Sequence, residues 1–140
     1  MNANAIEFDQ IADVLRSAKT IAVVGLSSSP LRPSYGVSAY MQSAGYTIIP
    51  INPAINGALG EKAYPTLLEV PSDEHIDIVN IFRRSELVPE VVDQAIQLKV
   101  PCIWMQEDIV NEAAAERARK SGITVIMDRC ILKEHRKRNR

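Results

Sequence analysis

Short apolar runs alternate with amphipathic stretches along the chain. Five of the runs are rich in Val and Ile, and they cover residues 21–24, 47–51, 76–82, 101–105 and 124–127. Apolar runs of strand length with little polar alternation are typical of strands that a parallel sheet buries on both faces. The pattern therefore predicts five buried strands.

The stretches between the runs place apolar residues at helical spacing, which predicts helices over residues 5–17, 35–44, 87–98 and 111–120. Residues that commonly end helices flank them, with N-caps expected at Ser34 and Asn111 and stops at Gly45 and Gly122. Residues 52–66 are rich in turn signals and predict a loop with a short extended piece near residues 62–64. A brief helix is expected over residues 67–70.

Strands and helices follow each other through short connections, which favours a single α/β domain over residues 1–140. We expect a Rossmann-like three-layer sandwich, a five-stranded parallel sheet with helices on both faces. Counting strands along the chain, the expected order is 3-2-1-4-5. Ligands of such sheets bind at the carboxyl ends of the strands, where the strand order reverses. The predicted crevice therefore lies between strands 1 and 4.

The loop after the first strand is the strongest candidate for a binding site. Gly25 ends the strand, and Leu26, Ser27, Ser28, Ser29 and Arg32 precede a predicted helix whose N-terminus attracts anions. A phosphate site and a well-capped, solvated loop both fit these residues. Gly25 is expected to end the central strand and to let a ligand approach without a Cβ in the way. Gly25→Val should then abolish binding and leave the fold intact.

NAD fits this loop poorly. The dinucleotide fingerprint Gly-x-Gly-x-x-Gly needs glycines where this chain has Ser27 and Pro30. It also needs a carboxylate after the second strand, which ends in Asn52-Pro53. Arginines follow several strands instead, namely Arg32, Arg83, Arg84 and Arg129. Since arginine binds phosphate oxygens bidentately, the pattern favours a polyphosphate, with at least one arginine expected to pair with Glu86 or Asp128.

Several segments together resemble one protein family: Val24-Gly25-Leu26-Ser27, Arg32-Pro33-Ser34-Tyr35-Gly36-Val37, Ile49-Pro50-Ile51-Asn52-Pro53, Phe82-Arg83-Arg84-Ser85-Glu86 and Met127-Asp128-Arg129-Cys130. They are similar to the small stand-alone CoA-binding proteins, whose fold is that of the CoA-binding domain of the succinyl-CoA synthetase α subunit. The resemblance implies coenzyme A as ligand, with its diphosphate near residues 25–29. It implies adenosine near Asn52-Pro53 and Phe82-Arg83.

The resemblance and the strand ends together give one set of candidate binding residues: Gly25, Leu26, Ser27, Ser28, Ser29, Arg32, Ser34, Tyr35, Asn52, Pro53, Phe82, Arg83, Arg84, Ser85 and Gln106. One departure follows Gln106, where relatives usually have Leu-Gly and this chain has Glu107-Asp108. Two carboxylates at that loop would repel phosphate.

No catalytic constellation and no metal-ligand spacing is evident. The two histidines, His75 and His135, fall away from the predicted crevice. Cys102 is expected in the core. Cys130 follows the last strand, and both a functional thiol, for example in a mixed disulfide with CoA, and a small buried apolar residue fit it.

Two classes of function follow. The favoured one is a non-catalytic CoA or acyl-CoA binding protein acting as a carrier, sensor or regulatory module. The alternative is a nucleotide-dependent enzyme, either an oxidoreductase or an acyl-CoA ligase subunit that needs a partner chain. Self-association or an unidentified protein partner stays open.

Composition narrows the class of protein and the cellular compartment that fit the chain. Hydrophobic residues make up 46% and charged residues 24% of the chain, as in ordinary globular proteins, and no apolar run is long enough to span a membrane. The acidic N-terminal segment does not fit a secretory signal, and two cysteines suit a reducing cytoplasm. The last eight residues carry five basic side chains and one acidic. This basic tail is expected to be frayed and solvated, because no basic stripe or stacking aromatics support nucleic-acid binding.

Overall fold

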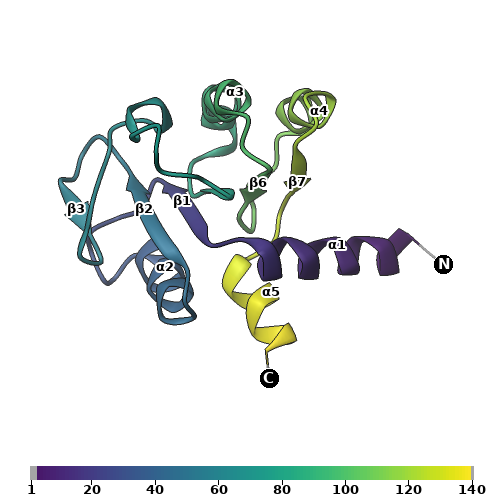
Figure 1. The fold of residues 1–140 in the computed structure, drawn as a ribbon, viewed down its shortest axis with the longest axis horizontal. Coiled ribbons are helices and arrows are strands. Elements are labelled where there is room, and N and C mark those ends of the chain that lie inside the picture. The colour runs from purple at the N-terminus through teal and green to yellow at the C-terminus, as the bar shows by residue number, and fades with distance from the viewer. Residues whose placement is uncertain (1–2, 140) are drawn as a thin grey trace.

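A parallel sheet of five strands forms the middle of the protein (Figure 1). The computed structural model describes the backbone of residues 3–139 and the side chains of residues 10–139. The strands are β1 (Thr20–Val24), β2 (Thr47–Ile51), β5 (Ile78–Ile81), β6 (Cys102–Met105) and β7 (Thr124–Ile126). All four pairings between neighbouring strands are parallel. The predicted sheet is therefore confirmed.

Helices cover both faces of the sheet, as the sequence predicts. On one face lie α1 (Ala3–Ser17), α2 (Pro33–Ser43) and α5 (Ile131–Arg138), and on the other lie α3 (Val88–Leu98) and α4 (Glu112–Lys120) (Figure 1). The buried residues accordingly form two clusters, one on each face. The expected three-layer sandwich is confirmed. No helix in the described part of the chain has the length and apolar character that crossing a bilayer requires.

The strand order differs from the expected one. The sheet runs β2-β1-β5-β6-β7, which is 2-1-3-4-5 when strands are counted as in the sequence, so the order 3-2-1-4-5 is wrong. Pro50 explains the difference. In β2, the Ile51 carbonyl faces β1 and accepts a hydrogen bond from Gly25 N. The Pro50 carbonyl faces the outer edge of the sheet instead, where it accepts a hydrogen bond from the Tyr64 N–H (3.0 Å). Proline has no N–H for a second neighbouring strand, so β2 suits the sheet edge.

The observed strand order changes where the ligand crevice is expected. The chain leaves β1 for β2 on one side and returns to β5 on the other, so the strand order reverses between β1 and β5 rather than between strands 1 and 4. The central strand is β5, and Gly25 follows a strand beside the edge strand. The ends of β2 and β5 therefore lie on opposite sides of the β1 end.

The connection from β2 to β5 is more ordered than expected. It contains a small antiparallel hairpin of β3 (Gly57–Ala58) and β4 (Glu61–Lys62), followed by the short helix η1 (Leu67–Glu69). Tyr64 then forms a parallel bridge with Ile51. The predicted brief helix is confirmed, and the hairpin adds to the prediction of a loop.

Helix ends agree with the sequence at three of four positions. The Asn111 side chain accepts a hydrogen bond from Ala114 N (3.1 Å), and Gly45 and Gly122 follow their helices in the left-handed region. The N-cap expected at Ser34 is wrong. The cap is Arg32, with Pro33 in the first helical position, where proline is favoured.

The expected solvated tail is also wrong over its described part. Residues 131–138 form α5, which packs against the sheet with Ile131 and Glu134 buried. Arg140 lies outside the described residues.

Candidate functional site

Gly25 follows β1 and lies close against Phe82, the residue that follows β5. Its φ is +90°, and a Cβ at this position would lie 2.4 Å from the Phe82 carbonyl oxygen. Its N–H donates to Ile51 O (2.8 Å), while Phe82 N donates to Val24 O (2.8 Å). Glycine is therefore required by the chain itself. The expectation that Gly25→Val leaves the fold intact is wrong.

The loop after Gly25 is held by its own hydroxyl groups. Ser27 N donates to Ser34 Oγ (3.0 Å), Ser29 N to Ser27 Oγ (3.0 Å) and Leu31 N to Ser29 Oγ (3.3 Å). Ser34 is buried within α2, whereas Ser28 is exposed. The hydroxyls thus fix the loop, as in the capped-loop interpretation, and they hold an exposed turn of backbone at the sheet edge.

Two arginines at this loop have no carboxylate partner among residues 10–139. The Arg83 Cδ lies 3.1 Å from where a Gly25 Cβ would be, so this side chain passes directly beside the turn. Arg32 is exposed at the start of α2. Neither makes an ion pair with a carboxylate in the described part of the chain. A cationic edge with no internal counter-charge is suited to an anion.

The other two arginines are paired. Arg84 Nε lies 3.3 Å from Glu86, which confirms that one arginine pairs with Glu86. Arg129 lies 3.8 Å from Glu134, near β7 on the far side of the sheet from β2. Arg32 and Arg83 are therefore the two candidate arginines that have no carboxylate partner among the described residues.

Asn52 ties the end of β2 to the loop. Its Nδ2 donates to Leu26 O (3.0 Å), and its Oδ1 accepts from Ala54 N (2.9 Å). Leu26 is fully buried, so its side chain belongs to the core. These two candidate residues shape the site. Three others are accessible there: Pro53 is exposed, and Tyr35 and Phe82 are half-buried.

Ser85 also has a structural role. It begins the short helix η2 (Ser85–Leu87), its Oγ accepts from Val110 N (3.1 Å), and its carbonyl accepts from Asn111 Nδ2 (3.0 Å). These bonds join the end of β5 to the start of α4. Ser85 thus holds the segment that carries Arg83 and Arg84.

Gln106 connects the end of β6 to α5. It is buried, and its Oε1 accepts a hydrogen bond from Ile131 N (3.0 Å). The neighbouring Glu107 pairs with Lys133 (3.0 Å). Lys133 thus neutralises one of the two carboxylates that the sequence predicts would repel phosphate.

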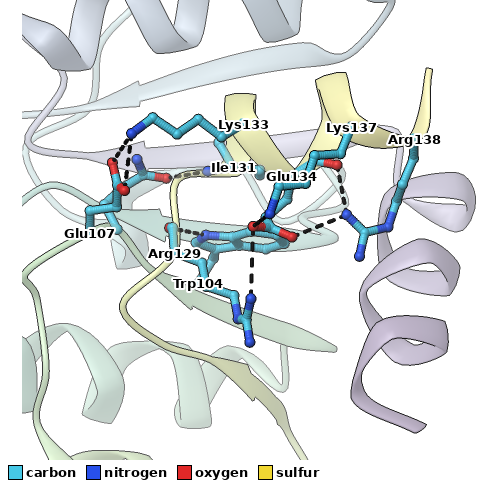
Figure 2. Close-up of polar contacts among 9 residues, drawn as sticks. Trp104, Glu107, Arg129, Ile131, Lys133, Glu134, Lys137 and Arg138 are labelled. Atoms are coloured by element: carbon cyan, nitrogen blue, oxygen red, sulfur yellow. Dashed lines mark hydrogen bonds and ion pairs between the residues drawn. The ribbon is translucent and has the colours of Figure 1, made fainter. Parts of the chain in front are cut away.

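Glu134 anchors α5 with a buried charge (Figure 2). Its carboxylate lies 3.1 Å from Arg138, 3.2 Å from Lys137 and 3.8 Å from Arg129. Burial raises the pKa of Glu134, but the hydrogen bonds from Arg138 and Lys137 outweigh burial and leave this pKa below its ordinary value. Sequence reasoning missed this anchor because its partners come from the last turn of α5 and from the loop before it.

Neither cysteine is exposed. Cys102 lies in β6, and burial raises its pKa to about 12, which confirms the expected core position. Cys130 is buried at the N-cap of α5. Trp104 is fully buried and donates from Nε1 to Arg129 O (2.8 Å).

A cavity of about 240 Å³ lies at the opposite edge of the sheet, lined by Leu67, residues 70–76 and residues 98–100. Its walls are the segments that precede β5 and β6, at the amino ends of these strands. It contains none of the candidate residues. The chemistry of the carboxyl edge, not this cavity, marks the candidate site.

Comparison with known proteins agrees with the geometry. Residues 19–136 match the family described as the CoA binding domain. The chain is 49% identical over 126 residues to "Uncharacterized protein YneT" of Bacillus subtilis, covering 90% of this chain and 92% of the relative. It is 30% identical over 81 residues to "Acetate--CoA ligase [ADP-forming] II" of Archaeoglobus fulgidus, covering 56% of this chain but only 12% of the ligase.

Solved structures show the same fold. A hypothetical protein from Pyrococcus horikoshii has a TM-score of 0.89 at 33% identity, covering 93% of this chain and 90% of that one. A dinucleotide forming acetyl-coenzyme A synthetase from Candidatus Korarchaeum cryptofilum has a TM-score of 0.67 at 25% identity, covering 79% of this chain and 26% of the synthetase. With the match over residues 19–136, these findings show that the chain belongs to the CoA binding domain family.

Proposed function

We propose that this protein binds coenzyme A or an acyl-CoA at the carboxyl ends of β1 and β5, without catalysing a reaction itself. The observation that carries the proposal is the position of Arg83, which lies beside the Gly25 turn with no carboxylate partner among the described residues. A sheet edge that presents guanidinium groups without a carboxylate partner in the described part of the chain, next to exposed backbone, favours a polyphosphate. Family membership favours coenzyme A as that polyphosphate.

The strand order supports one orientation of CoA along the carboxyl edge of the sheet. β1 lies between β2 and β5, so Asn52-Pro53 and Phe82-Arg83 stand on opposite sides of the Gly25 loop. We assign adenosine and its 3′-phosphate to the β2 side, where α2 carries the exposed Arg32. The diphosphate then lies against Arg83 and the Gly25–Ser29 loop.

A carrier, sensor or regulatory module in the cytoplasm is the role we propose, as a single chain or self-associated. The second candidate is a ligase subunit, which the similarity to part of an acetate–CoA ligase favours. That candidate requires a partner chain for the chemistry. An assay of this chain alone for ADP-forming ligase activity is expected to show none, and turnover by the single chain would contradict the non-catalytic role.

Thermal melts with three ligands test the proposal. CoA should stabilise most, dephospho-CoA less and NAD least, because a charge-assisted contact to the 3′-phosphate contributes about 1.5–3 kcal/mol. CoA at about 100 times its Kd should add roughly 2.7 kcal/mol, which for a chain of this size raises Tm by roughly 5–10 °C. Equal shifts with NAD and CoA would contradict the CoA assignment and favour an oxidoreductase.

Arginine variants distinguish contacts to the diphosphate from contacts to the 3′-phosphate. Arg83→Ala should weaken CoA and dephospho-CoA alike, by roughly 10- to 150-fold. Arg32→Ala should weaken CoA but leave dephospho-CoA nearly unchanged. Arg84→Ala is the control, since Arg84 is exposed and paired with Glu86. Titration calorimetry measures all three, and a loss in Arg84→Ala as large as in Arg83→Ala would show that general charge, not position, binds the ligand.

Cys130 should not contribute to CoA affinity. It is buried, and the phosphate contacts need no sulfur. Cys130→Ser is therefore expected to keep its Kd for CoA within a few-fold. A large loss, or a covalent CoA adduct in the wild type that disappears in the variant, would place the thiol in the mechanism.

A further inference from the structure

The two edges of the sheet differ in how they are closed. The β2 edge contains Pro50, and the bridge between Ile51 and Tyr64 covers part of it. At the other edge, β7 pairs only with β6 among the described residues. Natural sheets block their edges with short strands, proline, charges or covering segments. β7 is short, but residues 123–127 contain neither proline nor a charged residue, so this edge can accept another strand.

Val125 presents the outward backbone groups of this edge. Thr124 N donates to Pro101 O, just before β6 (3.1 Å), so the backbone groups of Thr124 face the sheet. Successive residues of a strand direct their backbone groups to opposite sides, so the N–H and the carbonyl of Val125 face away from the sheet. No strand in the described part of the chain lies there to bond them. One donor and one acceptor are thus available at the middle of β7.

The edge lies open between two helices. A cavity of about 260 Å³ borders β7, with α1 on one face of the sheet and α4 on the other (Figure 1). It is lined by Gln10, Ile11, Glu112, Arg119, residues 125–127 and Arg129. Val125 and Met127 are half-buried rather than buried. A second strand therefore has access to β7 from the side.

The charges of α4 are separated along the helix. Its acidic residues, Glu112 and Glu116, precede its basic residues, Arg117, Arg119 and Lys120. Glu112 and Arg119 both line the cavity at the β7 edge, two helical turns or about 10 Å apart. Both are exposed, and neither forms an ion pair in the described part of the chain. The face of α4 beside the edge therefore carries opposite charges at its two ends.

We propose that the β7 edge binds a second copy of this chain, with the two β7 strands antiparallel and one sheet continuing across both copies. About a two-fold axis at Val125, the N–H and carbonyl of this residue bond the carbonyl and N–H of the partner's Val125. The two α4 helices then lie antiparallel on the same face of the joined sheet. Glu112 faces the partner's Arg119, and Arg119 faces the partner's Glu112.

Charge complementarity favours a second copy as the occupant. A helix face that is acidic at one end and basic at the other complements the same face running in the opposite direction, and a two-fold contact supplies that reversal. β5 and β6 separate β7 from β1, so the interface leaves the Gly25 loop accessible. The inference therefore goes beyond the proposed CoA site and does not depend on it.

Sedimentation velocity of the full chain without CoA measures the association. The wild type should be a dimer. Val125→Pro should be a folded monomer, because proline lacks the N–H but suits an outward position of an edge strand. Val125→Ala loses similar packing, keeps the N–H and should stay dimeric, and circular dichroism checks that both variants fold. A dimeric Val125→Pro would overturn the interface, as would a wild type that is monomeric at about 100 µM, where even a micromolar Kd gives mostly dimer.

Charge reversal on α4 keeps the test decisive if Val125→Pro unfolds. Arg119→Glu and Glu112→Arg should each raise the dimer Kd by roughly 5- to 30-fold, because the two-fold axis turns two ion pairs into two repulsive contacts. Combining both substitutions should restore the wild-type Kd. Lys120→Glu is the control, since it makes the same charge change at a residue outside the cavity lining. A double variant no tighter than the single ones, or a control as weak as Arg119→Glu, would overturn the antiparallel pairing.

Discussion

Gly25→Ala should destabilise the folded protein by about 2–4 kcal/mol, because a single methyl group meets two obstacles at once. The residue has a φ of +90°, and the added Cβ would lie 2.4 Å from the Phe82 carbonyl oxygen. Backbone cannot move aside as a flexible side chain can, so the ends of β1 and β5 must separate. Chemical denaturation followed by circular dichroism measures the loss, and we expect Tm to fall by roughly 10 °C.

Gly36→Ala is the matched control. Gly36 lies within α2, and a Cβ there would have no heavy atom within 4 Å. Alanine is the better helix former by about 0.5–1 kcal/mol, so this variant should be slightly more stable than the wild type. If Gly25→Ala melted at the wild-type temperature, the close approach of β1 and β5 would be wrong.

Glu134→Gln should cost about 2 kcal/mol of stability. The substitution keeps the size of the side chain but removes the charge that three cations share inside the α5 contact, and hydrogen bonds to charged groups contribute about 1.5–3 kcal/mol. Glu116→Gln is the control, because Glu116 is exposed and lies 3.7 Å from Lys120. That variant should change stability by less than about 0.5 kcal/mol. Equal melting temperatures for Glu134→Gln and Glu116→Gln would show that Glu134 does not anchor α5.

The same helix should make stability depend on pH. The pKa of His135 is lowered by burial, and the pKa of Glu134 is lowered overall by its cationic neighbours. A group whose pKa is lower in the folded state stabilises the fold above its ordinary pKa and loses this contribution as pH falls. Stability should therefore decline below about pH 6.5 and decline further below about pH 4.5. In Glu134→Gln the second decline should be smaller.

Local sequence signals were sufficient for most of the fold. Apolar runs placed all five strands of the sheet, and Asn111 and Gly122 placed the ends of α4. These features depend on neighbouring residues, which is why they can be derived without the rest of the chain. The strand order could also have been derived, because Pro50 within an apolar run indicates an edge strand.

The features that were missed depend on contacts that form only once the chain is folded. Residues 133–140 read as a charged tail, yet Glu134 is buried because Arg129 and Arg138 surround it in the folded protein. Ser34 reads as a helix cap, but its hydroxyl accepts from Ser27 seven residues earlier. Gly25 was rightly singled out at the site. Glycine is required at this position because the Phe82 carbonyl lies beside it, and only the pairing of β1 with β5 brings that carbonyl close.

The most direct test of CoA binding at the β1–β5 edge is a titration of the ¹⁵N-labelled protein with CoA, followed by the backbone amide signals. We expect the largest shifts at residues 25–29, 32 and 82–84, with smaller ones at Gln106 and Ile131. The cavity of about 240 Å³ at the opposite edge of the sheet is the alternative binding site that the same titration examines. Shifts confined to residues 70–76 and 98–100, or no shifts with CoA at saturating concentration, would contradict the binding site proposed here.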